Sequence, residues 1–335
     1  MSSDPLRLAF FGTPEIALPT LETLNLSRHR VVSVISQPDR GRGRGRRRTP
    51  APVSAWALEQ EVPLLRPERI GDADSLAFLN RHQPDLGVVI AFGQFIPKSV
   101  RDQPRLGYLI NAHASLLPRH RGASPIQAAI LAGDAETGIS VMRVEKEMDA
   151  GAVALTRKIP IGHQEDTGHL TDRLGELAAQ AILEAVDQIA EDRVTWREQD
   201  AARVTYASRI EKHEGRLDWR ESASVLVRRI RALAPKPGAF TALPAVPGRS
   251  PESLRILGAR AISSTTESVH LSPGRLHRPA VAPSHLWVAT GEGWLELKRV
   301  QRSGGRVLEI SDFLRGHPLE DGQLLGDETE AIHGE

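Results

Sequence analysis

The feature that most constrains this chain is an alternation, in its first hundred residues, between short apolar runs and longer amphipathic segments. The runs 7–11, 31–36 and 86–92 have strand length and are apolar almost without interruption, as strands buried on both faces are. Segments 51–61 and 74–82, which lie between them, have helical spacing. The alternation predicts an α/β fold with a doubly wound parallel sheet.

The pattern changes after residue 190, where a long expected helix gives way to a polar connector. Beyond the connector the expected strands are short and separated by Gly and Pro, and His285 to Val300 has the pattern of a β-hairpin with its loop at 291–293. We therefore expect an α/β domain over 1–190, a linker over 191–210, a small β-barrel over 211–318 and an acidic tail over 319–335.

Length and charge agree with this division. A chain of 335 residues exceeds the usual size of a single core. Residues 1–210 carry 26 basic and 26 acidic side chains, whereas 211–318 carry 17 basic against 10 acidic ones. The second domain is therefore the basic one, which suits a polyanionic partner. The tail has six carboxylates and no Lys or Arg, so we expect it to be solvated.

The chain contains no cysteine, which excludes disulfides, thiolate metal ligands and a cysteine nucleophile. Its first residues lack the basic and then apolar pattern of a secretory signal. No apolar run approaches the ~18 residues of a membrane span. We expect a cytoplasmic protein without membrane contact.

The first βα turn tests for dinucleotide binding, because doubly wound sheets bind ligands at this edge. Gly12 is present, but Pro14 and Glu15 occupy the positions where the fingerprint needs further glycines. Without those glycines, Asp39 after the second strand is better explained as a turn residue than as a ribose ligand. The turn instead predicts a helix that starts at Pro14 and is capped by Thr13. A nicotinamide dehydrogenase is a poor interpretation.

The stretch from Asn111 to Gly122 places polar side chains at alternate positions where an apolar strand ends. Residues two apart on a strand point to one face, so Asn111 and His113 share a face at the edge where α/β sheets bind ligands. Asp149 lies in a turn after the next strand, from which its carboxylate can reach the same crevice. Amide, imidazole and carboxylate together can polarise a carbonyl, move a proton and orient the group that moves it.

Each of these residues also has an ordinary structural interpretation. A lone His at a strand end is commonly packed and hydrogen-bonded, and Asn and Asp are common turn formers. His113 and His120 lack the helical i, i+4 spacing of a zinc pair and have no thiolate beside them, so we predict no metal. Because a G-x-S-x-G elbow is missing as well, the combination favours direct attack by a substrate nucleophile on a bound carbonyl.

A second motif is a glycine-interleaved basic run over residues 40–48 that contains no acid. Its arginines are Arg40, Arg42, Arg44, Arg46, Arg47 and Arg48. Such a run cannot pack as a core element; it is either a solvated loop or a flexible arm that becomes ordered on a phosphate backbone. Because it follows the second strand at the same sheet edge as the expected site, we favour an RNA partner recognised by backbone and shape.

These motifs, in this order, resemble the methionyl-tRNA formyltransferase family. The stretches that carry the resemblance are FGTPEIA, QPDR with the following GRG and TPAPV, AFGQFIP, NAHASLLPRHRGASPIQAAILAGDAETGIS, MDAG and TYASRIEKHEGRLDW. The resemblance covers residues 7–318. It implies a Rossmann-like formyltransferase domain, a linker and an OB-like barrel that helps to hold tRNA. The implied reaction moves a formyl group from 10-formyltetrahydrofolate to the α-amino group of initiator methionyl-tRNA, supporting translation initiation, and we expect a monomer.

The resemblance also implies the site residues. The family's catalytic Asn, His and Asp fall on Asn111, His113 and Asp149, which the spacing had already singled out. The folate site falls on Ser115, Leu116, Leu117 and Pro118, with Phe92 and Gly93. The tRNA-contacting loop falls on the arginine run, in which two Gly-Arg-Gly copies overlap; counting back from Thr49 favours Arg44 as the main contact.

The same residues are compatible with two other functions. A folate formyltransferase that acts on a glycinamide nucleotide or an amino sugar would share the Asn, His and Asp but would not need the arginine run. An RNA-binding protein without catalysis would need the run and the basic barrel, but it would leave the Asn-His-Asp group unexplained.

Overall fold

The computed structural model describes residues 4–39, 41–42, 47–244, 252–262, 271–279, 282 and 284–326, with the backbone alone at 42, 47 and 48. Contacts divide the chain into two compact units. The first consists of Met1–Ile126, Ala135–Ile161 and Leu170–Ser208, and the second of Gln127–Asp134, Gly162–His169 and Arg209–Glu335. Residues 191–208 thus belong with the first unit, while the domain boundaries at 190 and 210 stay a prediction.

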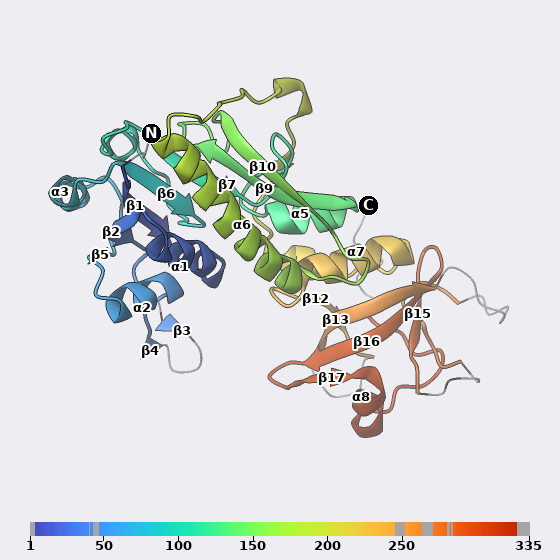
Figure 1. Ribbon diagram of the computed structural model, residues 1–335. Coiled ribbons are helices and arrows are strands. Elements are labelled where there is room, and N and C mark those ends of the chain that lie inside the picture. Colours follow the sequence, from blue (N-terminus) through green and yellow to red (C-terminus); the bar gives the residue numbers. More distant parts are fainter. Residues whose placement is uncertain are drawn as a thin grey trace. The chain divides into compact units, whose positions relative to one another are not determined.

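The first unit contains a seven-stranded sheet in the order β10-β9-β7-β6-β1-β2-β5 (Figure 1). Its parallel strands are β1 (Arg7–Gly12), β2 (Arg30–Ile35), β5 (Leu64–Leu65), β6 (Leu86–Ile90) and β7 (Leu109–His113). The strands β9 (Glu136–Arg143) and β10 (Val153–Pro160) add an antiparallel edge. β1, β2 and β6 are buried over nearly their whole length, which explains their apolar sequences. The predicted Rossmann-like α/β fold is confirmed.

The connecting helices are η1 (Glu15–Ala17), α1 (Leu18–Leu26), α2 (Pro52–Glu59), α3 (Ala73–His82), α4 (Lys98–Arg101), α5 (Pro125–Ala132) and α6 (Thr167–Ala190). The helix cap predicted at Thr13 is wrong. The Thr13 hydroxyl lies beside the end of β6, where it donates to the Phe92 carbonyl (3.1 Å) and accepts from the Gln37 backbone N–H (3.2 Å). Thr13 therefore joins two strand ends.

The arginine run begins as a hairpin in the described part of the chain. β3 (Gly41–Arg42) pairs antiparallel with β4 (Arg47–Arg48). An ion pair between Asp39 and Arg66 fixes the residue before the run. The predicted contacts Arg40, Arg44 and Arg46 lie outside the described residues.

The second unit contains an antiparallel sheet in the order β12-β13-β16-β15-β14, with β17 also paired to β16. The strands are β12 (Ala239–Ala242), β13 (Ser253–Ile262), β14 (Leu276–His277), β15 (Trp287–Ala289), β16 (Trp294–Arg302) and β17 (Val307–Glu309). The predicted hairpin is confirmed, because β15 pairs with β16 from Trp287 opposite Glu296 to Ala289 opposite Trp294.

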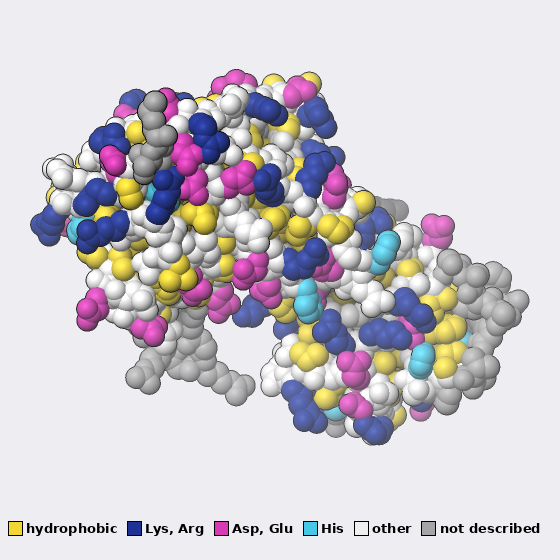
Figure 2. All heavy atoms as spheres, in the orientation of Figure 1, with side chains coloured by type: hydrophobic (Ala, Val, Ile, Leu, Met, Phe, Trp, Pro, Cys, Tyr) yellow, Lys and Arg dark blue, Asp and Glu magenta, His cyan; other side chains and the backbone are white. Residues whose placement is uncertain are grey.

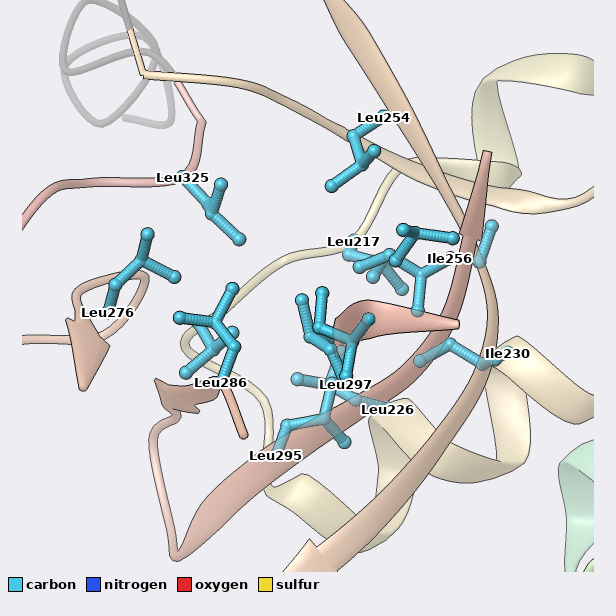
Figure 3. Close-up of a cluster of buried hydrophobic side chains, with 14 of the residues drawn as sticks. Leu217, Leu226, Ile230, Leu254, Ile256, Leu276, Leu286, Leu295, Leu297 and Leu325 are labelled. Atoms are coloured by element: carbon cyan, nitrogen blue, oxygen red, sulfur yellow. The ribbon is translucent and has the colours of Figure 1, made fainter. Parts of the chain in front are cut away.

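The core of the second unit lies between this sheet and helix α7 (Ala223–Leu233), and α8 (Ile310–Gly316) adds Phe313 to it. Figure 3 shows the leucine and isoleucine side chains that α7, β13 and β16 contribute: Leu226, Ile230, Leu254, Ile256, Leu295 and Leu297. Because successive strand residues alternate faces, Glu296 lies opposite the core side of β16.

The remaining short elements are β8 (Arg121–Gly122), β11 (Tyr206–Ala207) and the 3-10 turns η2 (Ala201–Arg203) and η3 (Lys212–Gly215).

On the face drawn in Figure 2, Lys and Arg side chains are interspersed with Asp and Glu side chains. Within the described residues, no helix has both the length and the apolar character needed to span a bilayer.

Candidate active site

The site is built around the carboxyl end of β7. This strand lies inside the sheet, where Asn111 pairs with Val89 of β6 on one side and with Met142 of β9 on the other. His113 follows two residues later, with only 6% of its surface exposed, and Asn111 is partly buried. The central position of β7 fixes both backbone positions, so the two side chains leave the sheet from one face.

The imidazole of His113 lies between two oxygen acceptors. Its Nε2 is 2.8 Å from the carbonyl oxygen of His120, and its Nδ1 is 3.5 Å from Oδ2 of Asp149. A neutral imidazole has one N–H and can donate to only one of these acceptors, whereas the charged ring donates to both. These two contacts fix the orientation of the ring at the end of β7.

Asp149 belongs to a turn between β9 and β10. Its backbone has a φ of 52°, in the left-handed region that Asp tolerates better than most residues. Its Oδ2 accepts a hydrogen bond from the backbone N–H of Gly122 (2.8 Å), and its side chain is 15% exposed. The structure thus brings His113 and Asp149 together, with Asn111 two residues earlier on β7; the catalytic roles of the three residues stay a prediction.

The stretch Ser115 to Pro118 continues from β7 as a tightly held loop. The Ser115 hydroxyl donates to the carbonyl of Arg119 (2.6 Å) and is buried, so it shapes the loop. Leu116, Leu117 and Pro118 are partly exposed. The loop therefore offers a partly exposed apolar surface next to the His113 end of β7, and its role as a folate site stays a prediction.

Ser140 is a residue that the sequence reasoning missed. From β9 its buried hydroxyl donates to the Ser115 carbonyl (2.8 Å) and accepts from the Leu117 N–H (3.1 Å). The signal was a single hydroxyl within the apolar stretch GISVMRV. Ser140 therefore fixes the start of the predicted folate loop.

Phe92 and Gly93, the other residues predicted to contact folate, follow strand β6 and do not offer an exposed apolar surface as the 115–118 loop does. The Phe92 ring is buried and packs edge-on against Phe11, with ring centroids 5.6 Å apart. The Phe92 carbonyl accepts from Gln37 Nε2 (2.9 Å), and a Cβ added at Gly93 would lie 2.3 Å from that same nitrogen. A ligand at this point would meet backbone and not the Phe92 ring, so the predicted folate contact stays a prediction for this pair.

The described residues contain no group of three or more His, Asp or Glu side chains placed to bind a metal ion. His120, the second histidine considered for zinc, has a φ of 58° and directs its carbonyl to His113. The His120 backbone therefore helps to orient the His113 ring.

Comparisons with known proteins define the class. The formyl transferase family model matches residues 6–186, and the model of the formyl transferase C-terminal domain matches 209–318. A crystal structure of an N-formyltransferase from Helicobacter canadensis shares the fold with a TM-score of 0.63 at 14% identity, covering 89% of this chain and 100% of that one. HypX from Aquifex aeolicus gives a TM-score of 0.59 at 17% identity, covering 96% and 51%. The fold is that of a formyl-transferring enzyme.

Curated relatives narrow the class. A methionyl-tRNA formyltransferase from Methylococcus capsulatus is 42% identical over 321 residues, covering 96% of this chain and 100% of the relative. One from Pseudomonas fluorescens is 40% identical over 331 residues, covering 98% and 99%. The chain belongs to the methionyl-tRNA formyltransferase family.

Proposed function

We propose that this enzyme transfers the formyl group of 10-formyltetrahydrofolate to the α-amino group of initiator methionyl-tRNA, which supports translation initiation. The observation that carries the proposal is the imidazole of His113, which lies between Asp149 and the backbone carbonyl of His120 and two residues after Asn111 on β7. Membership of the family supplies the reaction class, because the matched relatives align with nearly the full length of this chain.

In the proposed mechanism the neutral amine attacks the formyl carbon directly. Asn111 donates a hydrogen bond to the formyl oxygen as that oxygen gains charge. His113 takes the proton that the amine loses and delivers it to N10 of the folate as the bond between carbon and N10 breaks. Asp149 keeps the imidazole oriented and stabilises its charged form.

The formyl donor fits the residues present. The partly exposed Leu116, Leu117 and Pro118 supply an apolar surface for a flat pterin ring, and Ser140 holds that surface in shape. At Gly93, a φ of 81° and the closeness of Gln37 leave no room for a side chain. The glycine here is therefore explained by the packing of Gln37 and by the left-handed backbone.

We assign the tRNA contact to the arginine run and to the second unit. The run supplies the guanidiniums of Arg40, Arg42, Arg44, Arg46, Arg47 and Arg48, and the segment 211–318 has an excess of basic residues. Arginine recognises phosphate through paired donors, so these segments suit an RNA backbone. We also propose that the enzyme acts as a monomer in the cytoplasm, where translation uses its product.

Transfer of labelled formyl from 10-formyltetrahydrofolate is the test of this function. Initiator methionyl-tRNA, elongator methionyl-tRNA and a glycinamide nucleotide would be offered as parallel acceptors. We expect label on the initiator tRNA. Label on the small acceptor alone would preserve the chemistry and overturn the substrate, and no label on any acceptor would favour the RNA-binding alternative.

The arginine run has its own test. Replacing Arg42 and Arg44 together by Ala should weaken tRNA binding and reduce the slope of log affinity against log salt by about 2, because about one counterion per lost phosphate contact is no longer released. Arg69→Ala, an exposed arginine elsewhere in the first unit, serves as the control. An unchanged slope in the double variant would remove the run from the tRNA contact.

A further inference from the structure

We propose that Gln199 is a positioning residue, which holds the Asp149 turn so that its carboxylate faces His113. The proposal rests on the proposed function of that pair. Gln199 lies in the segment predicted as a polar linker, 50 residues after Asp149, and nothing in its sequence surroundings marks it as part of a site.

The nitrogen and the oxygen of the Gln199 side-chain amide both form hydrogen bonds to residues next to the site. Its Nε2 donates to the backbone carbonyls of Asp149 (2.7 Å) and Gly151 (2.8 Å). Its Oε1 accepts from Nε (3.0 Å) and Nη2 (2.8 Å) of Arg121. Since Arg121 only donates and the two carbonyls only accept, a single orientation of the amide satisfies all four bonds. Gln199 therefore pins the turn on each side of Ala150.

The four hydrogen bonds of the Gln199 amide form a clamp on the Asp149 turn. Arg121 connects this clamp to His113, the partner of Asp149. It is nearly buried, at 8% exposure, and lies between the two residues that touch the pair. Its predecessor His120 gives a carbonyl to His113 Nε2, and its successor Gly122 gives an N–H to Asp149 Oδ2. One glutamine side chain therefore links the segment that orients the imidazole to the turn that carries the carboxylate.

The backbone around Gln199 is itself fixed to the first unit, as a positioning role requires. Arg197 forms an antiparallel bridge with Val153, and the strand β11 pairs in parallel with β8. Thr205 accepts from the His120 N–H (2.8 Å). This segment is held at both ends and makes a rigid support for the clamp.

A stacked cation strengthens the start of the segment. The guanidinium of Arg143, at the end of β9, lies 4.5 Å from the ring centre of Tyr108 and 4.3 Å from that of Trp196. The two rings meet edge-on with their centres 5.7 Å apart. Cation–π contacts of this kind hold Trp196, and with it the approach to Gln199, against the sheet.

The chemistry of the clamp supplies a discriminating substitution. Glu has the shape of Gln and can still pair with Arg121, but it has no donor for the carbonyls of Asp149 and Gly151. Gln199→Glu should therefore stay folded while it releases the turn. Gln199→Ala removes both sides of the clamp. Gln188→Ala is the matched control, because the side chain of this partly buried glutamine of α6 bonds only Glu184 among the side-chain contacts described for it.

Formyl transfer and thermal unfolding of the full chain would be measured for the three variants. We expect kcat to fall roughly tenfold to a hundredfold in Gln199→Glu, because catalysis is sensitive to small displacements of reacting groups, with KM for both substrates changed by about twofold or less. Gln188→Ala should behave as wild type. A kcat of Gln199→Glu within about twofold of wild type would overturn the proposal.

A double-mutant cycle separates positioning from general support. If Gln199 acts through the carboxylate, Gln199→Glu should cost almost nothing further in kcat once Asp149→Asn is present. An equal loss in both backgrounds would mean that Gln199 supports the fold and not the Asp149 carboxylate.

Amide hydrogen exchange distinguishes failure of the clamp from failure of the proposed function. In Gln199→Ala, exchange should accelerate in residues 147–151 and stay unchanged in α3. Should the wild-type enzyme transfer no formyl group, this result alone decides whether Gln199 holds the turn: faster exchange supports the clamp, and unchanged exchange at 147–151 overturns it.

Discussion

Two acidic side chains, Asp149 in the first unit and Glu296 in the second, are largely removed from solvent but differ in the number of cationic partners that surround them. The Asp149 side chain is 15% exposed and has a backbone N–H and one imidazole as its charge-stabilising neighbours among the described contacts. The Glu296 side chain is 1% exposed and contacts three cationic or ionisable groups, Arg260, His285 and Lys298.

The difference in partners predicts different roles for the two carboxylates. Lys298 and Arg260 outweigh the effect of burial and hold the pKa of Glu296 below its ordinary value, so this carboxylate stays charged and bound. Asp149 instead has a partner that can gain and lose a proton. Removing Asp149 should therefore affect the reaction, and removing Glu296 should affect the fold.

The largest effect should come from the neighbour that shares the site with Asp149 but carries no charge. Asn111→Ala removes the proposed donor to the formyl oxygen and should lower kcat by ~10²–10³-fold, with little change in the free energy of unfolding. Single-turnover formyl transfer and urea unfolding measure the two quantities. Near-normal turnover would show that the site does not use this amide.

Asp149→Asn addresses the contrast directly. Asn tolerates the left-handed backbone and can still accept from the Gly122 N–H, so the free energy of unfolding should change by less than about 1 kcal/mol. The imidazole loses its carboxylate, and kcat should fall by roughly 10–100-fold. A variant that unfolds easily but turns over normally would reverse the interpretation.

Glu296→Gln should show the opposite pattern. Loss of the ion pairs should destabilise the protein by about 1–2 kcal/mol at pH 7, while kcat stays close to wild type. Because the folded pKa lies below the unfolded one, the stabilising contribution is complete above about pH 4.3 and is lost as pH falls through the lower folded value. Urea unfolding between pH 7 and pH 3 should show the two proteins converging, and a constant difference would contradict this account.

The smallest effect is expected at Asp187 on α6, a carboxylate of the first unit that resembles Glu296 in its partners. Burial alone would raise the pKa of Asp187, but hydrogen bonds from Arg28 and His29 bring it below its ordinary value. The side chain is 37% exposed, so solvent screens these pairs and Asp187→Asn should cost under about 1 kcal/mol, with kcat unchanged. This stability is present above about pH 4 and is lost in acid. A loss of kcat would show that location, and not partners, separates the two kinds of carboxylate.

The sequence predicted those parts of the site that follow from local periodicity. The alternation at Asn111 and His113, together with the turn at Asp149, was enough to expect them at one edge of the sheet, and the parallel strand order confirms the sheet that makes this edge. Local spacing identifies residues that one strand or one turn presents.

Contacts between distant segments were beyond the same reasoning. Gln199 reaches Asp149 and Arg121 only after β11 has paired with β8, and a polar residue in a polar segment gives no periodic signal. The helix cap predicted at Thr13 was wrong for a related reason. The local sequence fits a cap, but the Thr13 hydroxyl bonds the Phe92 carbonyl after β6, a partner that local sequence does not indicate. Ser140 carried a signal, a hydroxyl within an apolar strand, although not the identity of its partners.

The pairing of β11 with β8 has a consequence for the order in which the protein is made. Thr205 contacts His120 across 85 residues, so a ribosome that has just finished the arginine at position 121 must continue for on the order of ten seconds before the matching strand exists. During that interval the sheet of the first unit can assemble, but the turn carrying Asp149 has no clamp. A nascent chain released after residue 190 would lack β11 and Gln199, and with them the contacts that hold the Asp149 turn.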